Sequence, residues 1–354
     1  MKKSLDRYEL LGRSALRVSP LSLGTMTFGT EWGWGADEKE ARRMFDHYVA
    51  RGGNFIDTAN AYTGGTSESF VGQFSEGRRD KLVIATKYTG TMDPADPNSG
   101  GNHRKSLVRN VEASLRRLRT DYLDLLYLHA WDATTPVEEL ARAFDDLVRA
   151  GKLLHVGMSN VPAWQIARLQ TIADVRGTTP VVALQMEYNL IERTGETDMI
   201  PMARALGLGI VPWSPLASGV LTGKYTRKDL GEGEASPSGS RKNVAQAQNS
   251  LHERGLAIAD VVKAIAGEID RSPAQVALAW VLAQPGVTSP IIGARTIAQL
   301  DDNLGALDLE LAPAHLDRLA TASAFDLPYP HGMLARGMTK TVMYGTAKVA
   351  GLTV

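Results

Sequence analysis

Eight short apolar runs constrain the fold of this chain more than any other feature of its sequence. Each run is followed by a helical pattern, and the runs recur along the 354 residues. They contain little alternation of polar and apolar residues, which is typical of strands that are buried on both faces of a parallel sheet. The eight runs end near Gly24, Asp57, Lys87, His129, Ser159, Gln185, Trp213 and Gly293.

The spacing of these runs indicates how they connect. The first six intervals between their ends are 33, 30, 42, 30, 26 and 28 residues, and each interval holds one strand, one helix and two loops. Eight such units with right-handed crossovers close most simply into a (β/α)8 TIM barrel, whereas a doubly wound sheet seldom needs eight regular units. We therefore expect one barrel domain over residues 1–324 and a tail over residues 325–354, whose weak periodicity predicts no structure.

The segments between the runs carry signals for helix ends. Asp37 is expected to cap a helix that stops at residues 52–53, both glycine. A second helix is predicted to begin at residues 135–136 and to stop at Gly151. Thr296 opens the capping-box pattern T-I-A-Q.

Two segments depart from the repeating unit. Residues 8–18, with Gly-Arg-Ser at their centre, predict a short β-hairpin before the first barrel strand. The last interval is 80 residues long, and its first part, residues 227–250, is rich in Gly, Ser, Asn and Lys. This composition predicts a long mobile loop after the seventh strand, and such loops often close over a ligand.

Composition excludes several classes of protein. Lys plus Arg and Asp plus Glu both number 39, so no basic excess draws the chain to nucleic acid or to an anionic membrane. No cysteine is present, which rules out disulfides and thiolate chemistry, and the seven histidines are scattered singly, so no metal site is expected. There is no signal-peptide pattern and no apolar run of membrane-spanning length, so we expect a cytoplasmic protein.

Four ionisable residues lie at or just after three consecutive predicted strand ends. They are Asp57, Tyr62, Lys87 and His129. Each one alone has an ordinary explanation, as a turn residue, a packing group, a solvent-facing lysine or a rim histidine. Active sites of TIM barrels, however, gather at the carboxyl ends of the strands. The combination therefore favours a catalytic group over four unrelated structural residues.

Seven motifs in the chain resemble those of the aldo-keto reductase family, in order and at family spacing. They are FIDTANAY, VIATK, LDLLYLH, VGMSN, LQMEYNL, WSPL and IIGARTIAQLDDN, and the resemblance spans about residues 8–319. It is greatest for the branch that contains bacterial reductases and potassium-channel beta subunits. The resemblance implies a TIM barrel, NADP-linked carbonyl reduction and a catalytic tetrad of Asp57, Tyr62, Lys87 and His129.

The chemistry of these four side chains fits that role. Reduction of a carbonyl needs hydride at carbon, which a nicotinamide carries, and a proton at oxygen. Tyr62 starts near a pKa of ~10 and needs a nearby cation to stabilise its phenolate, which Lys87 would provide. Asp57 would orient the lysine, and His129 would donate a hydrogen bond to the carbonyl oxygen.

A second set of residues is expected to bind NADP(H). Short amides and hydroxyls at strand ends suit the nicotinamide carboxamide, although loop capping explains them equally well. The resemblance implies an aromatic ring at Trp213 stacked on the nicotinamide, and Arg295 beside a helix start suits a 2′-phosphate. Asp301 and Asp302 are predicted to face away from this cluster, so nothing acidic would oppose the phosphate. The expected cofactor residues are Gly24, Thr25, Asp57, Ser159, Asn160, Gln185, Trp213, Ser214, Leu216, Gly219, Leu221, Lys224, Gly293, Arg295, Gln299 and Asn303.

The substrate pocket is expected to be aromatic. Trp32, Trp34 and Trp131 lie in loops at the predicted site and suit an apolar or ring-bearing carbonyl, although packing explains them nearly as well. The sequence departs from the family pattern at Thr63, where many members have glycine, and at Ala130, which is smaller than usual. The alternative hypothesis is a subunit that binds NADP(H) and senses redox state with little turnover. A barrel metallohydrolase is a third and weaker one.

Overall fold

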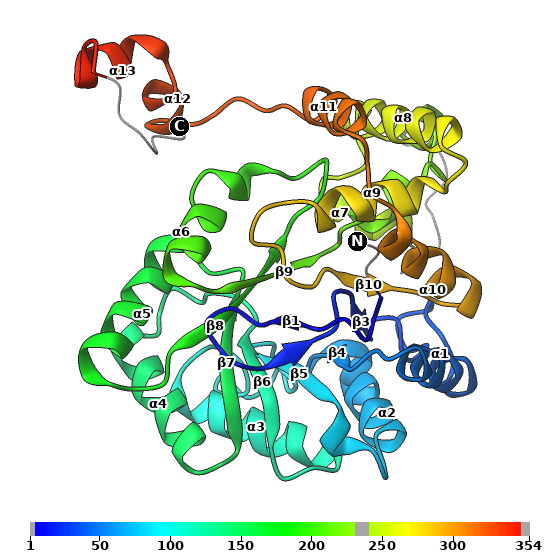
Figure 1. Cartoon of the computed structure of the whole chain (residues 1–354). Coiled ribbons are helices and arrows are strands. Elements are labelled where there is room, and N and C mark those ends of the chain that lie inside the picture. Colours follow the sequence, from blue (N-terminus) through cyan, green and yellow to red (C-terminus); the bar gives the residue numbers. More distant parts are fainter. Residues whose placement is uncertain (1–3, 231–240, 348–354) are drawn as a thin grey trace.

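Parallel strands form a ring at the centre of the protein (Figure 1). The computed structural model describes residues 4–230 and 241–347, and within them eight strands make up the ring. Around the ring they are β3 (Ser22–Gly24), β4 (Phe55–Asp57), β5 (Val83–Tyr88), β6 (Leu123–Leu128), β7 (Leu153–Ser159), β8 (Val181–Glu187), β9 (Gly209–Trp213) and β10 (Ile291–Gly293).

β10 closes the ring, because it lies between β3 on one side and β9 on the other. β10 pairs in parallel with β3, and next to β10 the Thr288 N–H donates to the Ile210 carbonyl of β9 over 2.8 Å. Every predicted apolar run forms its strand, and each strand ends within two residues of the expected position. The predicted TIM barrel is therefore confirmed.

Helices pack around the outside of the ring (Figure 1). They are α1 (Glu38–Ala50), α2 (Thr66–Phe74), α3 (Arg104–Leu118), α4 (Val137–Arg149), α5 (Ala163–Arg176), α6 (Met199–Leu206), α7 (Arg241–Ala247), α8 (Glu253–Glu268), α9 (Pro273–Leu282), α10 (Ile297–Leu304) and α11 (Pro313–Ala322). Short 3₁₀ helices are η1 (Tyr62–Gly65), η2 (Arg79–Lys81), η3 (Thr194–Glu196), η4 (Ala217–Thr222), η5 (Arg227–Leu230) and η6 (Gly305–Asp308).

Two of the predicted helix caps form. The Asp37 carboxylate accepts from the Glu40 N–H at the start of α1, and the Thr296 hydroxyl accepts from the Gln299 N–H at the start of α10. The side chain of Gln299 in turn accepts from the backbone N–H of Arg295 over 2.9 Å. Because each cap satisfies an orphan backbone N–H, these helices begin where the sequence indicates.

The predicted hairpin closes the amino end of the barrel. β1 (Glu9–Leu10) and β2 (Arg17–Val18) pair antiparallel, and Gly12 in their connection has a φ of +56°. A Cβ atom at Gly12 would come within 2.3 Å of the Val182 carbonyl oxygen and 2.4 Å of the Gly209 nitrogen. Glycine is therefore required where the hairpin meets β8 and β9.

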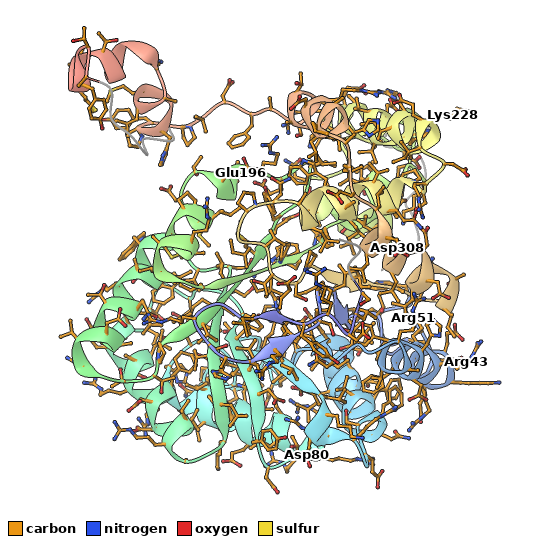
Figure 2. The ribbon with its side chains drawn as sticks, in the orientation of Figure 1. Arg43, Arg51, Asp80, Glu196, Lys228 and Asp308 are labelled. Atoms are coloured by element: carbon orange, nitrogen blue, oxygen red, sulfur yellow. The ribbon has the colours of Figure 1, made fainter. Side chains whose placement is uncertain are left out.

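Apolar side chains fill the interior of the ring. Figure 2 shows the side chains of the whole protein, with charged residues such as Arg51 and Asp80 at its periphery. Phe55, Leu125 and Tyr127 belong to this inner cluster and are completely buried. A Cβ at Gly157 would lie 2.4 Å from the Tyr127 ring, so glycine makes room for the tyrosine. The interior is thus a packed core, and the polar site lies beyond it at the carboxyl ends of the strands.

The segment after β9 contains helical turns that its composition does not indicate. A long mobile loop is predicted over residues 227–250, and within it η5 and α7 are helical, while the predicted mobility stays a prediction. Ala245 of α7 is completely buried, so packing against the barrel stabilises a helix that the polar sequence around it does not reveal. Residues 231–240, the remainder of the predicted loop, lie outside the described residues.

The tail contains two short helices, α12 (His331–Leu334) and α13 (Gly337–Tyr344), which stand apart from the barrel in Figure 1. The His331 imidazole lies 3.0 Å from the carboxylate of Asp198, at the start of α6. Among the residues that the structure describes, no helix combines the length and apolar character needed to cross a bilayer.

A buried ion pair joins α2, α3 and β5. The Glu68 carboxylate is fully buried, accepts from the Thr86 hydroxyl over 2.5 Å and lies 2.6 Å from Nε of Arg117. We expect Glu68→Ala to lower the free energy of unfolding by about 3 kcal/mol, because it leaves the Arg117 charge uncompensated. Chemical denaturation measures this loss, and Asp96→Ala, which breaks the exposed pair with Arg109, is the matched control. Equal small losses in both variants would contradict the expectation.

Candidate active site

The four candidate catalytic side chains come together at the carboxyl end of the barrel. Asp57 ends β4, Lys87 is the fifth residue of β5, His129 follows β6, and Tyr62 opens η1 after β4. The Lys87 ammonium donates to the Asp57 carboxylate over 2.5 Å, to the Thr58 carbonyl over 2.8 Å and to the Tyr62 hydroxyl over 3.1 Å. The rings of Tyr62 and His129 meet edge to face at 5.9 Å.

Lys87 and Asp57 form a buried ion pair, and their exposed fractions are 0% and 2%. Burial acts to lower the pKa of Lys87, but the charge of Asp57, the Tyr62 phenolate that forms at high pH and the hydrogen bonds to both groups outweigh it and leave that pKa raised. The second carboxylate oxygen of Asp57 accepts from the Gln185 amide over 2.8 Å. The ammonium therefore stays charged at neutral pH, held by a carboxylate that is itself oriented by β8.

The phenol of Tyr62 is protonated at neutral pH. Burial raises its pKa, the charge of Lys87 lowers it, and the charge of Asp57 raises it further, with a net rise above the ordinary value of 10. Lys87 thus acts in the expected direction, but desolvation is the larger effect. The hydroxyl is suited to donate a proton, and the adjacent ammonium stabilises the phenolate that donation leaves.

The imidazole of His129 is neutral over the whole physiological range. Burial lowers its pKa, and the positive charge of Lys87 lowers it further, to about 3. A neutral imidazole keeps one N–H donor, so His129 can donate a hydrogen bond without supplying a charge. Any titration near neutral pH must therefore come from another group.

A cavity of about 550 Å³ begins at Tyr62 and His129 and extends past β9 to α10. Most residues expected to bind the cofactor line it, drawn from six strand ends and the following loops. Those on its wall are Gly24, Asp57, Ser159, Asn160, Gln185, Trp213, Ser214, Leu216, Gly219, Lys224, Gly293, Arg295, Gln299 and Asn303.

Thr25 and Leu221 are not on the wall of this cavity. The hydroxyl and the backbone N–H of Thr25 both donate to the Asp57 carbonyl, over 3.0 and 2.9 Å, so Thr25 holds the end of β4 in place. Leu221 is completely buried in the hydrophobic core, because the 3₁₀ turn of η4 directs its side chain inward. Their expected contacts with the cofactor stay predictions that the cavity wall does not support.

Asp302 does line the cavity, so the expectation that it faces away from Arg295 and Gln299 is wrong. On a helix, residues three apart share a face as closely as residues four apart, and Asp302 follows Gln299 by three. The Asp302 carboxylate accepts from the Gln275 amide of α9 over 3.1 Å. An acidic group is therefore present near Arg295, although α9 supplies it with a donor.

Several wall residues were not expected from the sequence, although Pro215, Ile291, Ile292, Ala294 and Asp302 lie inside the quoted motifs. Gln248 follows α7, and its side chain accepts from the hydroxyl of Ser218. Thr27 donates to the Ala294 carbonyl over 2.7 Å and so joins the loop after β3 to the end of β10. The wall residues not foreseen are Met26, Thr27, Pro215, Ser218, Thr222, Gln248, Ile291, Ile292, Ala294 and Asp302.

The three tryptophans lie around the catalytic end rather than on the wall of the cavity. Trp32 meets the Tyr62 ring edge to face at 6.3 Å, and Trp34 packs on Trp32 at 5.6 Å. Trp131 is half-buried, and its backbone N–H donates to the Asn160 carbonyl over 3.2 Å. Trp32 is therefore positioned beside the proposed acid, with Trp34 behind it.

Asn160 connects two parts of the site. Its amide donates to the His129 carbonyl over 2.8 Å, and its side-chain oxygen accepts from the Trp213 indole N–H over 3.2 Å. Asn160 has a φ of +51°, a left-handed conformation that costs free energy in a residue other than glycine. Strain of this kind is found where surrounding contacts hold a functional geometry.

The described part of the chain contains no cluster of three or more side chains that could hold a metal ion. At the catalytic end of the barrel, the Lys87 ammonium and the Tyr62 hydroxyl are in direct contact.

Comparison with known proteins identifies the family. The model of the aldo/keto reductase family matches residues 20–324. The uncharacterized oxidoreductase YrpG of Bacillus subtilis is 40% identical, over 86% of this chain and 92% of its own length. A norsolorinic acid reductase of Aspergillus flavus is 35% identical, over 95% and 86%. The aryl-alcohol dehydrogenase (NADP(+)) of Phanerodontia chrysosporium is 34% identical, over 94% and 89%. The chain therefore belongs to the aldo/keto reductase family of oxidoreductases.

Proposed function

We propose that the protein is an NADP(H)-dependent carbonyl reductase that converts small aldehydes or ketones to alcohols. The observation that carries this proposal is the contact of the Lys87 ammonium with both Asp57 and the Tyr62 hydroxyl, 2.5 and 3.1 Å away, at the end of a large cavity. A protonated phenol beside a fixed cation is the arrangement that proton transfer to a developing alkoxide needs.

Each catalytic side chain has a separate task. The neutral imidazole of His129 donates to the carbonyl oxygen and orients it toward Tyr62, and Tyr62 then donates the proton. Lys87 stabilises the resulting phenolate, and Asp57 holds the ammonium in place. In alcohol oxidation the same phenolate takes the proton back. A bound nicotinamide supplies or accepts the hydride.

The cavity wall fits a dinucleotide with a 2′-phosphate. Ser159, Asn160 and Gln185 would bind the carboxamide, and the Trp213 ring, held by Asn160, offers a flat apolar face. At the other end, Arg295 precedes the start of α10 and makes no ion pair with any residue in the described ranges. A cation without a carboxylate partner beside a helix start favours phosphate.

Arg295→Ala is expected to weaken NADPH binding about tenfold or more and NADH binding hardly at all. A charged hydrogen bond contributes roughly 1.5 to 3 kcal/mol, and only NADPH carries the 2′-phosphate that would receive it. Fluorescence titration with both cofactors measures the two losses. Arg43→Ala is the control, because Arg43 points outward from α1 (Figure 2) and is not among the residues that line the cavity. Equal losses for both cofactors would mean that Arg295 acts on the pyrophosphate or on folding.

Ring-bearing carbonyl compounds are the substrates that the catalytic end favours. Trp32 beside Tyr62 and Trp34 behind it offer aromatic surface next to the proposed acid. The name of one relative, aryl-alcohol dehydrogenase (NADP(+)), points to the same class of compound. Aromatic pairs of this kind stabilise contacts beyond the area that they bury.

Steady-state oxidation of NADPH with a panel of aliphatic and aromatic aldehydes tests the proposed function. We expect many turnovers per protein molecule, with higher kcat/KM for the aromatic aldehydes. Oxidation that stops after a single cofactor load would instead support a subunit that binds NADP(H) and senses redox state.

A further inference from the structure

A buried asparagine outside the tetrad holds the strand end that carries His129. Asn102 lies directly before His103, the cap of α3, and its exposed fraction is 0%. All four of its polar groups have partners. Its amide nitrogen donates to the Ala130 carbonyl over 3.0 Å, and its amide oxygen accepts from the Thr89 hydroxyl over 2.8 Å.

The backbone of Asn102 is held as firmly as its side chain. Its N–H donates to the Asp132 carboxylate over 2.6 Å, and its carbonyl accepts from the Tyr88 hydroxyl over 3.2 Å. The same carboxylate of Asp132 also accepts from the N–H groups of Thr134 and Thr135, both at 2.9 Å. One residue thus joins the end of β5, the start of α3 and the loop after β6.

Thr89 extends this contact to His129 itself. The Thr89 hydroxyl accepts from the His129 N–H over 3.3 Å while it donates to Asn102. Thr89 has a φ of +110°, a conformation that a β-branched residue seldom adopts. Such strain persists where surrounding contacts over-determine the backbone, and here those contacts lead from Asn102 to His129.

The backbone of His129 has two further hydrogen bonds, to Asn160 and to Tyr88. Its carbonyl accepts from the Asn160 amide over 2.8 Å, while its N–H also points to the Tyr88 carbonyl at 3.1 Å. The ring is neutral, so no ion pair orients it. The ring packs edge to face on Tyr62, and the backbone that carries it is held by Asn102 at Ala130 and, through the Asp132 carboxylate, at the end of the segment.

We propose that Asn102 is a positioning residue for His129, which holds the imidazole where it meets the substrate carbonyl. The proposal rests on the proposed reductase function for its kinetic consequence. It assigns to Asn102 no contact with substrate or cofactor. Misplacement of a hydrogen-bond donor by about 1 Å can cost up to about 10²-fold in rate.

Asn102→Ala is expected to lower kcat/KM for aldehydes about 10- to 100-fold and to leave the Kd of NADPH unchanged. Asn54→Ala is the matched control, because the Asn54 amide also bridges backbone groups, donating to Arg17 and accepting from Ser19, but at the amino end of the barrel. Asn54→Ala should reduce stability without a selective loss of kcat/KM.

A double-mutant cycle separates positioning from a general structural role. In the His129→Ala background, Asn102→Ala should cause little further loss of kcat/KM, since the group that it positions is already gone. Its effect on Tm should be the same in both backgrounds. An equal loss of kcat/KM with and without His129, or a loss under about twofold in the single variant, would overturn the proposal.

Two further measurements test the proposal if Asn102→Ala does not fold or if the wild type shows no turnover. Thr89→Val removes the hydroxyl between Asn102 and His129 with little change of volume, and it should reproduce part of the loss if Asn102→Ala does not fold. The imidazole signal of His129 in a ¹H–¹³C NMR spectrum, assigned with His129→Ala, should shift or broaden in Asn102→Ala but not in Asn54→Ala. This readout needs no turnover, so it decides the role of Asn102 even if the wild type reduces no carbonyl. An unchanged signal would overturn the proposal.

Discussion

Tyr62→Phe is expected to lower kcat for carbonyl reduction at least ~10²-fold, which corresponds to about 2.7 kcal/mol of transition-state stabilisation. The change removes the hydroxyl that lies 3.1 Å from the Lys87 ammonium and keeps the ring that packs between Trp32 and His129. Because the hydroxyl is the proposed proton donor, the loss should fall on the chemical step. Single-turnover oxidation of NADPH with a reactive aldehyde measures that step directly.

Cofactor affinity provides the control for Tyr62→Phe. The phenol hydroxyl is proposed to act on the substrate oxygen, so the Kd of NADPH should change by less than about twofold. Turnover close to that of the wild type would show that another group supplies the proton. A large loss of NADPH affinity would mean that Tyr62 holds the cofactor, and its assignment as the acid would then have no kinetic support.

Lys87→Met is expected to be comparably inactive and to change the pH dependence as well. The charge of Lys87 lowers the pKa of Tyr62, so its removal raises a pKa that burial already places above the ordinary value. Alcohol oxidation needs the phenolate, whose population rises with pH through the pKa of Tyr62. The midpoint of the kcat–pH profile for oxidation should therefore move to higher pH in this variant.

Lys87→Met also removes the charge partner of Asp57, so a loss of activity in this variant could come from a loss of stability. A second variant separates the two effects. Without the ammonium, Asp57 is a buried charge whose remaining donor is the Gln185 amide, so the single variant loses stability or takes up a proton. The double variant Asp57→Asn with Lys87→Met removes both charges and should recover most of the Tm while staying inactive. The charges of Lys87 and Asp57 act on the pKa of Tyr62 in opposite directions, so the midpoint should shift less in the double variant than in Lys87→Met. A profile in Lys87→Met that differs from the wild type only in amplitude would count against the assigned role of Lys87.

Local sequence patterns are sufficient to predict the strands, some of the helix starts and the family. Apolar runs without alternation form strands buried on both faces, and the cap at Asp37 depends only on a few residues around it. Strand ends also decide which residues face the site, because parallel strands in a barrel all end at the same rim. This is why Asp57, Lys87 and Gln185 could be singled out before any distance was known.

Contacts between distant segments decided what the sequence did not show. Thr25 and Leu221 lie in the expected segments but point away from the cavity, because side-chain direction depends on the turn that each loop adopts. Asp302 joins the wall, and Gln248 reaches it from beyond a helix that local composition did not predict. Such directions are set by packing between elements far apart in the chain.

The electrostatic character of the site was also determined only by the tertiary structure. The sequence by itself determined that a tyrosine, a lysine and a histidine lie at one rim of the barrel. From the sequence alone, each of them can be given only the ordinary pKa of its residue type. Burial then raised the pKa of Tyr62 above its ordinary value and lowered that of His129 to about 3. Asn102 became part of the site through partners on β5 and after β6, which no spacing along the chain reveals. Desolvation and long-range hydrogen bonds depend on what surrounds a group in space, and that surrounding exists only once the barrel has closed.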